Sequence, residues 1–248
     1  MWIFRGLRDG VVTTRWPRRP DTYFDAWRGP ATVIGDATGA AETPCPTSAI
    51  RRGPGGVTLD QGRCIQCGRC VEAAPETFTW SRGSDVATLT REALTVPAET
   101  DENLAKVRED LARRTRALGR SVHIRHVDAG SDGAEEWEIL ALLNPVYDVH
   151  RLGVFFTASP RHADILLVTG AGARGMTAPL RRTFEGTPDP KVVIAAGTDA
   201  ISGGIVGPSY ATSSGIGETV PVDVWVPGSP PSPFALLHAI LLAIGGVS

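Results

Sequence analysis

The chain is poor in cysteine, in long hydrophobic runs and in net charge, and each shortage narrows the range of functions. Its 248 residues include four cysteines, three of them such near neighbours that disulfides among them would be strained. The longest apolar stretch, residues 234–244, is interrupted by His238 and is shorter than the roughly 20 residues that cross a bilayer. The net charge of −2 implies neither nucleic acid nor an anionic membrane surface as a partner.

What the sequence does contain is consistent with a folded protein of one or two domains. Hydrophobic residues make up 42% of the chain, which is enough for a packed core, and domains usually have roughly 100–200 residues. We recognise no signal peptide, so no oxidising compartment is indicated. We therefore expect a cytoplasmic protein, which can still dock peripherally on a complex at the inner face of the cell membrane.

The spacing of the four cysteines is the strongest functional signal. Cys64, Cys67 and Cys70 form a C-x₂-C-x₂-C run, and Cys45 precedes Pro46. In a two-cluster ferredoxin each run reads C-x₂-C-x₂-C-x₃-C-P, and its last cysteine binds the cluster of the other run. Here the three cysteines of one run and the final Cys-Pro of the other remain. Together they match the ligand set of a single 4Fe–4S cluster.

Two other interpretations of the cysteines carry less weight. Zinc sites prefer paired C-x₂-C or Cys/His knuckles, and no histidine lies near these cysteines in the sequence. Disulfides would need an oxidising compartment. A cubane needs four soft thiolates, and the short loop supplies three of them while a distant segment supplies the fourth. The sequence therefore predicts one 4Fe–4S cluster on Cys45, Cys64, Cys67 and Cys70.

Composition and periodicity divide the chain into four parts. Residues 1–30, rich in Arg, Pro and Trp, are expected to form an extended N-terminal arm. Residues 31–95 form a small ferredoxin-like α+β module that the cluster helps to fold. Residues 96–119 are predicted to be a linker helix, because Leu104, Val107 and Leu111 fall on one face over 99–118. Residues 120–248 form a second domain.

This second domain has the pattern of a flavodoxin-like α/β fold. Continuous apolar strands that alternate with helices indicate a parallel sheet covered on both faces. Functional loops in such folds lie at the carboxyl ends of the strands. The expected strands are 121–127, 154–158, 165–169, 192–196 and 222–226, and the expected helices are 135–143, 178–184 and 233–244.

Long stretches of the chain resemble two neighbouring subunits of one family of complexes. Residues 62–70 and the Trp16-Pro17 arm resemble the ferredoxin-like subunit of energy-converting NiFe hydrogenases and formate hydrogenlyase. Residues 120–248 resemble the adjacent small subunit, which is homologous to the proximal-cluster (20 kDa) subunit of respiratory complex I. The chain therefore resembles a fusion of the two. The matching stretches in the second half are 123–131, 143–148, 158–170, 200–204 and 226–231.

One ligand set of that family is missing here. In the family four cysteines hold a cluster near the catalytic centre, and the matching positions are Asp132, Glu135, Asp199 and Ser229. No thiolate remains among them, so we expect no 4Fe–4S cluster at this place. The three acids would suit a hard cation, but we favour a solvated, vacated pocket filled by small or polar residues.

Two smaller patterns have both a functional and a structural interpretation. Residues 170–175 read Gly-Ala-Gly-Ala-Arg-Gly and resemble a dinucleotide fingerprint, but no acidic residue follows at the usual distance, so a structural turn is favoured. Glu136 and Glu138 match acidic positions of the family. They could transfer protons, although acids are also favoured in a first helical turn by the helix dipole.

The resemblance leads to two functional hypotheses. In the first, the chain is an iron–sulfur electron-transfer subunit of a hydrogenase-related or complex I-like oxidoreductase, rather than an enzyme by itself. Its partners would be a hydrogenase-like or complex I-like large subunit and membrane-arm subunits. In the second, it is a non-catalytic assembly or coupling subunit whose cluster is structural or redox-sensing. The intact four-cysteine set favours the first hypothesis, and the lost ligands favour the second.

Overall fold

The computed structural model describes residues 2–35, 45–53, 55–97, 104–116 and 121–245. Its second half contains a parallel sheet of β6 (Val122–Asp128), β7 (Val154–Phe156), β8 (Ile165–Thr169), β9 (Val192–Ala196) and β10 (Val224–Val226). The strand order is β10-β9-β8-β6-β7, with every pair parallel. Counted along the domain this is the order 2-1-3-4-5 of flavodoxin-like folds, which confirms the predicted fold class.

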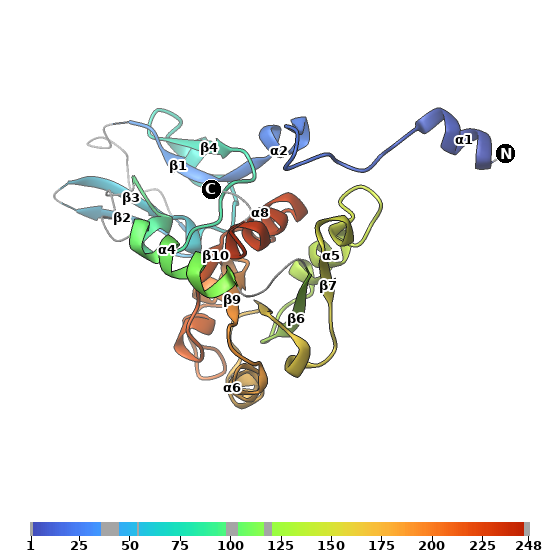
Figure 1. Ribbon diagram of the computed structural model, residues 1–248. Coiled ribbons are helices and arrows are strands. Elements are labelled where there is room, and N and C mark those ends of the chain that lie inside the picture. Colours follow the sequence, from blue (N-terminus) through green and yellow to red (C-terminus); the bar gives the residue numbers. More distant parts are fainter. Residues whose placement is uncertain (1, 36–44, 54, 98–103, 117–120, 246–248) are drawn as a thin grey trace.

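Alternate residues of the sheet pack into two separate cores. On β8, Ile165 and Leu167 belong to a core with α8 (Pro233–Ala243), whereas Leu166 and Val168 belong to a core with α6 (Thr177–Gly186) and α7 (Thr198–Ser202). α5 (Ala134–Ala141) contributes Ile139 to the first core. Burial on both faces explains the continuous apolar runs of these strands. α8 is buried along its whole length and lies at the centre of the molecule (Figure 1).

The first half contains two small antiparallel sheets around their own core. β1 (Arg28–Val33) pairs with β4 (Phe78–Arg82), while β3 (Gly56–Asp60) pairs with β2 (Ile50–Gly53) and β5 (Thr95–Val96). The short helix α3 (Arg69–Ala73) and the 3-10 turn η1 (Gln61–Arg63) lie between β3 and β4. The core of this module contains Ala31, Val57, Leu59, Cys64, Ala74 and Phe78.

The two halves are joined by backbone and side-chain contacts. Thr88 and Trp225 exchange two backbone hydrogen bonds of 2.9 and 2.8 Å, so the module adds an antiparallel bridge at the edge of β10. The predicted linker helix is present as α4 (Leu104–Thr115), and its Leu111 packs into the α8 core. The rest of the predicted helix, 99–103 and 117–118, lies outside the described residues.

Residues 1–30 contain helices as well as extended chain. α1 (Trp2–Asp9) projects away from the rest of the molecule, whereas α2 (Thr22–Ala26) lies close to α8 (Figure 1). Between them, Trp16 is 7% exposed and stacks on Phe24 with ring centroids 4.7 Å apart. Trp16 also meets Phe234 of α8 edge-on at 6.2 Å. The aromatic contact holds this part of the segment on the α/β domain. The division of the chain at residues 30, 95 and 119 stays a prediction.

Candidate metal centre

The cysteine loop follows β3 and is bent by two residues in the left-handed region. Asp60 accepts a hydrogen bond from Gly62 N at 2.9 Å, which caps η1, and Cys64 follows that turn. Gln66 has φ 55° and Gly68 has φ 83°, a conformation that glycine adopts without steric cost. These bends reverse the chain between Cys64 and the start of α3, so that Cys70 faces the same hollow as Cys64.

All four cysteines line one pocket, although Cys45 comes from a distant segment. None of the four forms a disulfide. Cys64 is 9% exposed, Cys45 and Cys70 are half-buried, and Cys67 is exposed. The structure thus brings the predicted ligands together. The pocket lining consists of Ala31, Cys45, Pro46, Thr47, Ala49, Ile50, Leu59, Cys64, Ile65, Cys67, Gly68, Arg69 and Cys70.

The thiols influence one another electrostatically. Burial and the charges of Cys64 and Cys45 raise the pKa of Cys70 to about 11, with burial the largest cause. Burial also raises the pKa of Cys64, with smaller contributions from Cys45 and Cys67. Four thiolates held this close repel one another, and a bound metal centre relieves that repulsion because its positive charge deprotonates the thiols outright. The donor set is therefore chemically suited to a 4Fe–4S cluster.

Cys45 differs from the other three because its sulfur is hydrogen-bonded. Ala49 N donates to Cys45 Sγ at 3.3 Å, and Thr47 Oγ1 lies 3.5 Å from the same sulfur. Burial by itself would raise the pKa of Cys45, but the hydrogen bonds from Thr47 and Ala49 lower it below its ordinary value. Hydrogen bonds to ligand sulfurs are one of the means by which proteins tune cluster potentials.

No three His, Cys, Asp or Glu side chains among the described residues are placed to hold a single metal ion. In a zinc site each sulfur would lie about 2.3 Å from one central ion. In a cubane each thiolate binds a different iron, so the sulfurs form a wider ring. The fit of the cluster therefore rests on the ring of four cysteines and their spacing.

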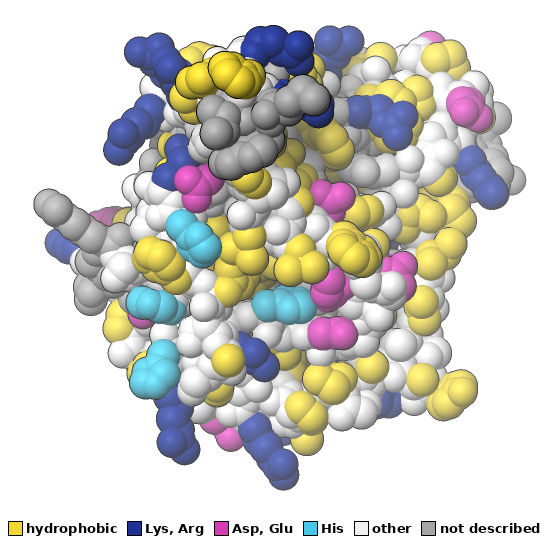
Figure 2. Space-filling view, turned by 90° about the vertical axis from the view of Figure 1, so that its right-hand side faces the viewer, with side chains coloured by type: hydrophobic (Ala, Val, Ile, Leu, Met, Phe, Trp, Pro, Cys, Tyr) yellow, Lys and Arg dark blue, Asp and Glu magenta, His cyan; other side chains and the backbone are white. Residues whose placement is uncertain are grey.

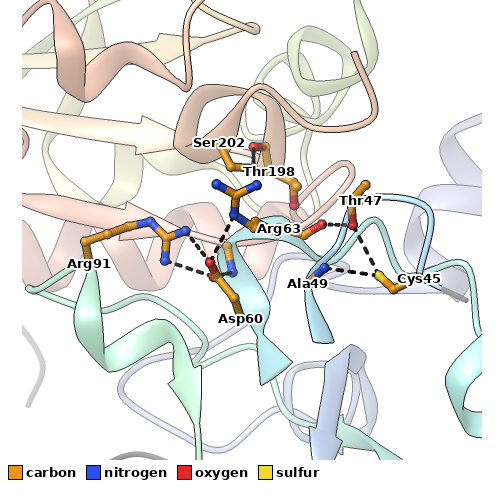
Figure 3. Close-up of polar contacts among 9 residues, drawn as sticks. Cys45, Thr47, Ala49, Asp60, Arg63, Arg91, Thr198 and Ser202 are labelled. Carbon is orange, nitrogen blue, oxygen red and sulfur yellow. Dashed lines mark hydrogen bonds and ion pairs between the residues drawn. The ribbon is translucent and has the colours of Figure 1, made fainter. Parts of the chain in front are cut away.

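The cysteine loop sits directly on the α/β domain (Figure 3). Arg91 donates two hydrogen bonds to Asp60, of 2.9 and 2.7 Å, and Arg63 Nε lies 3.5 Å from the same carboxylate. Thr198 Oγ1, at the start of α7, donates to the backbone oxygen of Cys64 at 3.1 Å. The cysteine loop thus rests on the helix that carries Asp199, one of the four positions without a family cysteine.

Three of those four positions also come together. Glu135 is 2% exposed, and burial raises its pKa to about 7, with further contributions from the charges of Asp199, Asp132 and Glu136. Burial likewise raises the pKa of Asp199, and Asp132 raises it further. The carboxylate of Glu135 packs on Gly197, where an added Cβ would lie 2.5 Å from Glu135 Oε1. We call Asp132, Glu135 and Asp199 the acidic cluster.

The fourth position, Ser229, lies on a segment next to α7. Thr198 N donates to the backbone oxygen of Gly228 at 2.7 Å, and this bond places the 228–231 turn beside the acidic cluster. The segments that carry the four positions are thus held together, and all four side chains have oxygen donors. A preformed site for one cation is not found there among the described residues.

Sequence reasoning missed the polar network beside the acidic cluster. His126 Nε2 lies 3.0 Å from Thr169 Oγ1, which donates to Glu136 Oε1 at 2.6 Å, and Ser131 Oγ donates to Glu136 Oε2 at 2.5 Å. Burial lowers the pKa of His126, although the charge of Glu136 acts in the opposite direction. The sequence singled out Glu136, but its partners His126, Ser131 and Thr169 had no signal beyond the position of Thr169 at the end of a buried strand, where functional loops begin.

Two of the three glycines in residues 170–175 lie against other parts of the chain, whereas Gly175 has open space around it. At Gly170, with φ 85°, an added Cβ would lie 2.5 Å from the carbonyl carbon of Gly130. At Gly172, with φ 67°, it would lie 3.3 Å from Gly215. These close approaches account for both glycines without a nucleotide and favour the interpretation as a structural turn.

Two family models match the chain. The NADH ubiquinone oxidoreductase 20 kDa subunit matches residues 133–243, and a 4Fe–4S single cluster domain matches residues 57–114. The second match contains Cys64, Cys67 and Cys70, whereas Cys45 lies outside it. Among the described residues, no helix is long and apolar enough to cross a membrane.

Similar proteins come from bacterial and archaeal complexes. Formate hydrogenlyase subunit 7 of Escherichia coli (strain K12) is 41% identical over 150 residues, which are 60% of this chain and 58% of that protein. The probable membrane-bound hydrogenase subunit mbhJ of Pyrococcus furiosus is 42% identical over 139 residues, which are 56% of this chain and 83% of that protein.

A solved structure with a similar chain is the membrane-bound sulfane sulfur reductase, an archaeal respiratory membrane complex. The similar chain is 32% identical, with a TM-score of 0.46, and the match covers 53% of this chain and 75% of that one. Because most of the archaeal hydrogenase subunit is matched at 42% identity, and the 20 kDa model matches residues 133–243, the chain belongs to the family of the NADH ubiquinone oxidoreductase 20 kDa subunit and joins to it a 4Fe–4S ferredoxin domain.

Proposed function

We propose that the chain is an electron-transfer subunit of a hydrogenase-related or complex I-like oxidoreductase, with one 4Fe–4S cluster on Cys45, Cys64, Cys67 and Cys70. The observation that carries the proposal is the convergence of these four free cysteines, from two segments, on one pocket. When bound, such a cluster accepts and releases single electrons. The cysteines would hold it, and the Ala49 N–H would stabilise the sulfur of Cys45.

The proposed partners follow from the relatives. Formate hydrogenlyase and the membrane-bound hydrogenase are, by name, multi-subunit systems. We therefore infer a hydrogenase-like or complex I-like large subunit and membrane-arm subunits as partners, and a cytoplasmic position at the inner face of the membrane. The exposed apolar side chains of α5, Trp137 at 74% and Leu140 at 55% exposure, support docking of another protein on this helix.

One observation favours the alternative of an assembly or coupling subunit. The scaffold of the second ligand set carries Asp132, Glu135, Asp199 and Ser229, so electrons would have no cluster at that place. A comparison of purified complexes separates the two functions. If Cys67→Ser leaves the complex assembled but stops electron transfer from donor to acceptor, the electron-transfer function is supported. Full electron transfer without the cluster supports the assembly function.

The cluster itself is tested by iron content under anaerobic conditions. Cys45→Ser should lower iron from about four per chain to near zero, as the ligand set of one cubane implies. Asp199→Ser is the matched control, because it removes a side chain at a position where the family has a cysteine, and it should leave iron unchanged. Retention of full iron content in Cys45→Ser would remove Cys45 from the ligand set.

A further inference from the structure

Several large apolar side chains of the N-terminal segment are exposed to solvent. α1 and the residues after it project from the molecule (Figure 1). Phe4, Leu7 and Val11 are 75%, 76% and 81% exposed. Arg5 and Arg8 lie on the same short helix. Exposed apolar side chains next to basic ones are a feature of segments that lie in a membrane interface.

A hollow lined by arginines begins where this segment reaches the folded domain. Its lining consists of Val11, Thr13, Thr14, Arg15, Arg18, Arg19 and Arg151, and no acidic side chain that the structure describes belongs to it. Basic side chains gather along the upper edge of the face in Figure 2, next to hydrophobic ones. The region around the hollow is therefore strongly positive, although the net charge of the whole chain is −2.

Hydrogen bonds fix the walls of this hollow. Thr13 Oγ1 donates to Pro145 O at 2.7 Å, and Thr14 N donates to Val146 O at 2.8 Å. Across the hollow, the guanidinium of Arg151 donates to the backbone oxygens of Trp16 and Tyr147. Arg15, Arg18 and Arg19 are thus carried by a segment that is anchored at three points to the α/β domain, which supplies Arg151.

The hollow carries an excess of positive charge, although Asp148 offsets part of the charge of Arg151. Among the described residues, no carboxylate forms an ion pair with any of the four arginines. The carboxylate of Asp21 accepts bonds from Thr14 Oγ1 and Tyr23 N. Burial lowers the pKa of Arg151; the charge of Asp148 raises it and that of Arg18 lowers it. Arg18 and Arg151 therefore repel each other, and an anion between them would relieve that repulsion.

We propose that the arginine hollow binds the phosphate group of an anionic phospholipid while Phe4, Leu7 and Val11 enter the membrane interface. The forked guanidinium matches phosphate oxygens in bidentate geometry, and basic residues beside a membrane are attracted to anionic lipid. A free phosphate would use the arginines but leave the apolar side chains in water, so the lipid accounts for both features. The inference does not depend on the cluster.

Binding to lipid vesicles tests the proposal on the full chain with its iron. The protein should float with phosphatidylglycerol vesicles and not with phosphatidylcholine vesicles, and inorganic phosphate should compete. Arg18→Gln with Arg19→Gln should weaken vesicle binding about 30-fold, because each basic residue at an anionic surface contributes roughly fivefold. Arg181→Gln with Arg182→Gln, two exposed arginines of α6, is the matched control and should change binding less than twofold.

A second variant separates lipid from free phosphate. Phe4→Ser with Leu7→Ser should weaken vesicle binding but leave the competition by inorganic phosphate intact. The proposal is overturned if the Arg18/Arg19 variant binds vesicles like the wild type. It is also overturned if inorganic phosphate binds while vesicles do not, or if only an acidic protein partner is bound. Iron content in the same samples keeps the result distinct from a failure of the proposed function.

Discussion

In both the cysteine pocket and the acidic cluster, side chains from separate segments of the chain come together, but the donor atoms are sulfur in the first and oxygen in the second. In the pocket, four soft thiols from two segments surround one hollow. In the acidic cluster, three carboxyl groups on two segments lie together, at positions where the resemblance to the family leads us to expect cysteines. Thr198 connects the two places, since its hydroxyl bonds to Cys64 O and the next residue is Asp199.

The largest effect is expected from replacing the oxygen donors at these positions by thiols, the donors that the cysteine pocket contains. Replacing Asp132, Glu135, Asp199 and Ser229 together by cysteine should allow a second cubane, because the carrying backbone is in place. Anaerobic reconstitution should then raise iron from about four toward about eight per chain. Iron that stays near four, in a variant whose circular dichroism matches the wild type, would mean that the scaffold has changed as well as its side chains.

A smaller effect is expected from Glu135, whose pKa is raised from 4.5 to about 7. The unfolded chain ionises this carboxyl above pH 4.5 while the folded chain keeps it protonated, so the free energy of unfolding falls as pH rises from about 4.5 to 7. The full loss is roughly 3 kcal/mol for that difference in pKa. Glu135→Gln should flatten this decline and be the more stable form at pH 7.5.

Denaturant unfolding between pH 5 and 8 measures this difference directly. Glu138→Gln is a useful control, because Glu138 lies on the same helix and is less buried, so its effect should be clearly smaller. Parallel pH profiles of Glu135→Gln and the wild type would contradict the assignment of a protonated Glu135.

The smallest effect is expected at the contact between the cysteine loop and residue 91. Arg91→Gln removes the pair of hydrogen bonds that Arg91 donates to the largely buried carboxylate of Asp60. The free energy of unfolding should fall by about 1.5–3 kcal/mol, as is usual for hydrogen bonds to charged groups. Arg113→Gln removes the ion pair with Asp110, whose two side chains are 72% and 57% exposed, and should cost under about 1 kcal/mol. Equal costs for the two, in thermal unfolding, would contradict a structural role for Asp60 and Arg91.

The sequence predicted the parts of this fold that are local and periodic. The strands 165–169 and 192–196 have the predicted bounds, because continuous apolar runs leave little choice for a buried parallel strand. The last helix was predicted one residue too long, at 233–244 against Pro233–Ala243. The cysteine pocket followed from spacing alone, since three of its donors lie in one short loop.

Contacts between distant segments could not be predicted in this way. Three such contacts join residues 31 or more positions apart in the sequence: Trp16 with Phe234, Thr88 with Trp225, and Arg91 with Asp60. No periodic pattern in the sequence marks these pairs. The same holds for the network of His126, Thr169 and Glu136. Burial of Glu135 also had no sequence signal, because an acid in the first turn of a helix is usually solvated.

The central claim is that this chain holds one cluster, in the cysteine pocket, and none at the acidic cluster. Anaerobically purified wild-type chain, analysed for metals and by electron paramagnetic resonance after reduction, tests it most directly. The account predicts about four iron per chain and one signal without spin coupling to a neighbour. About eight iron with two interacting signals, or zinc in place of iron, would contradict it.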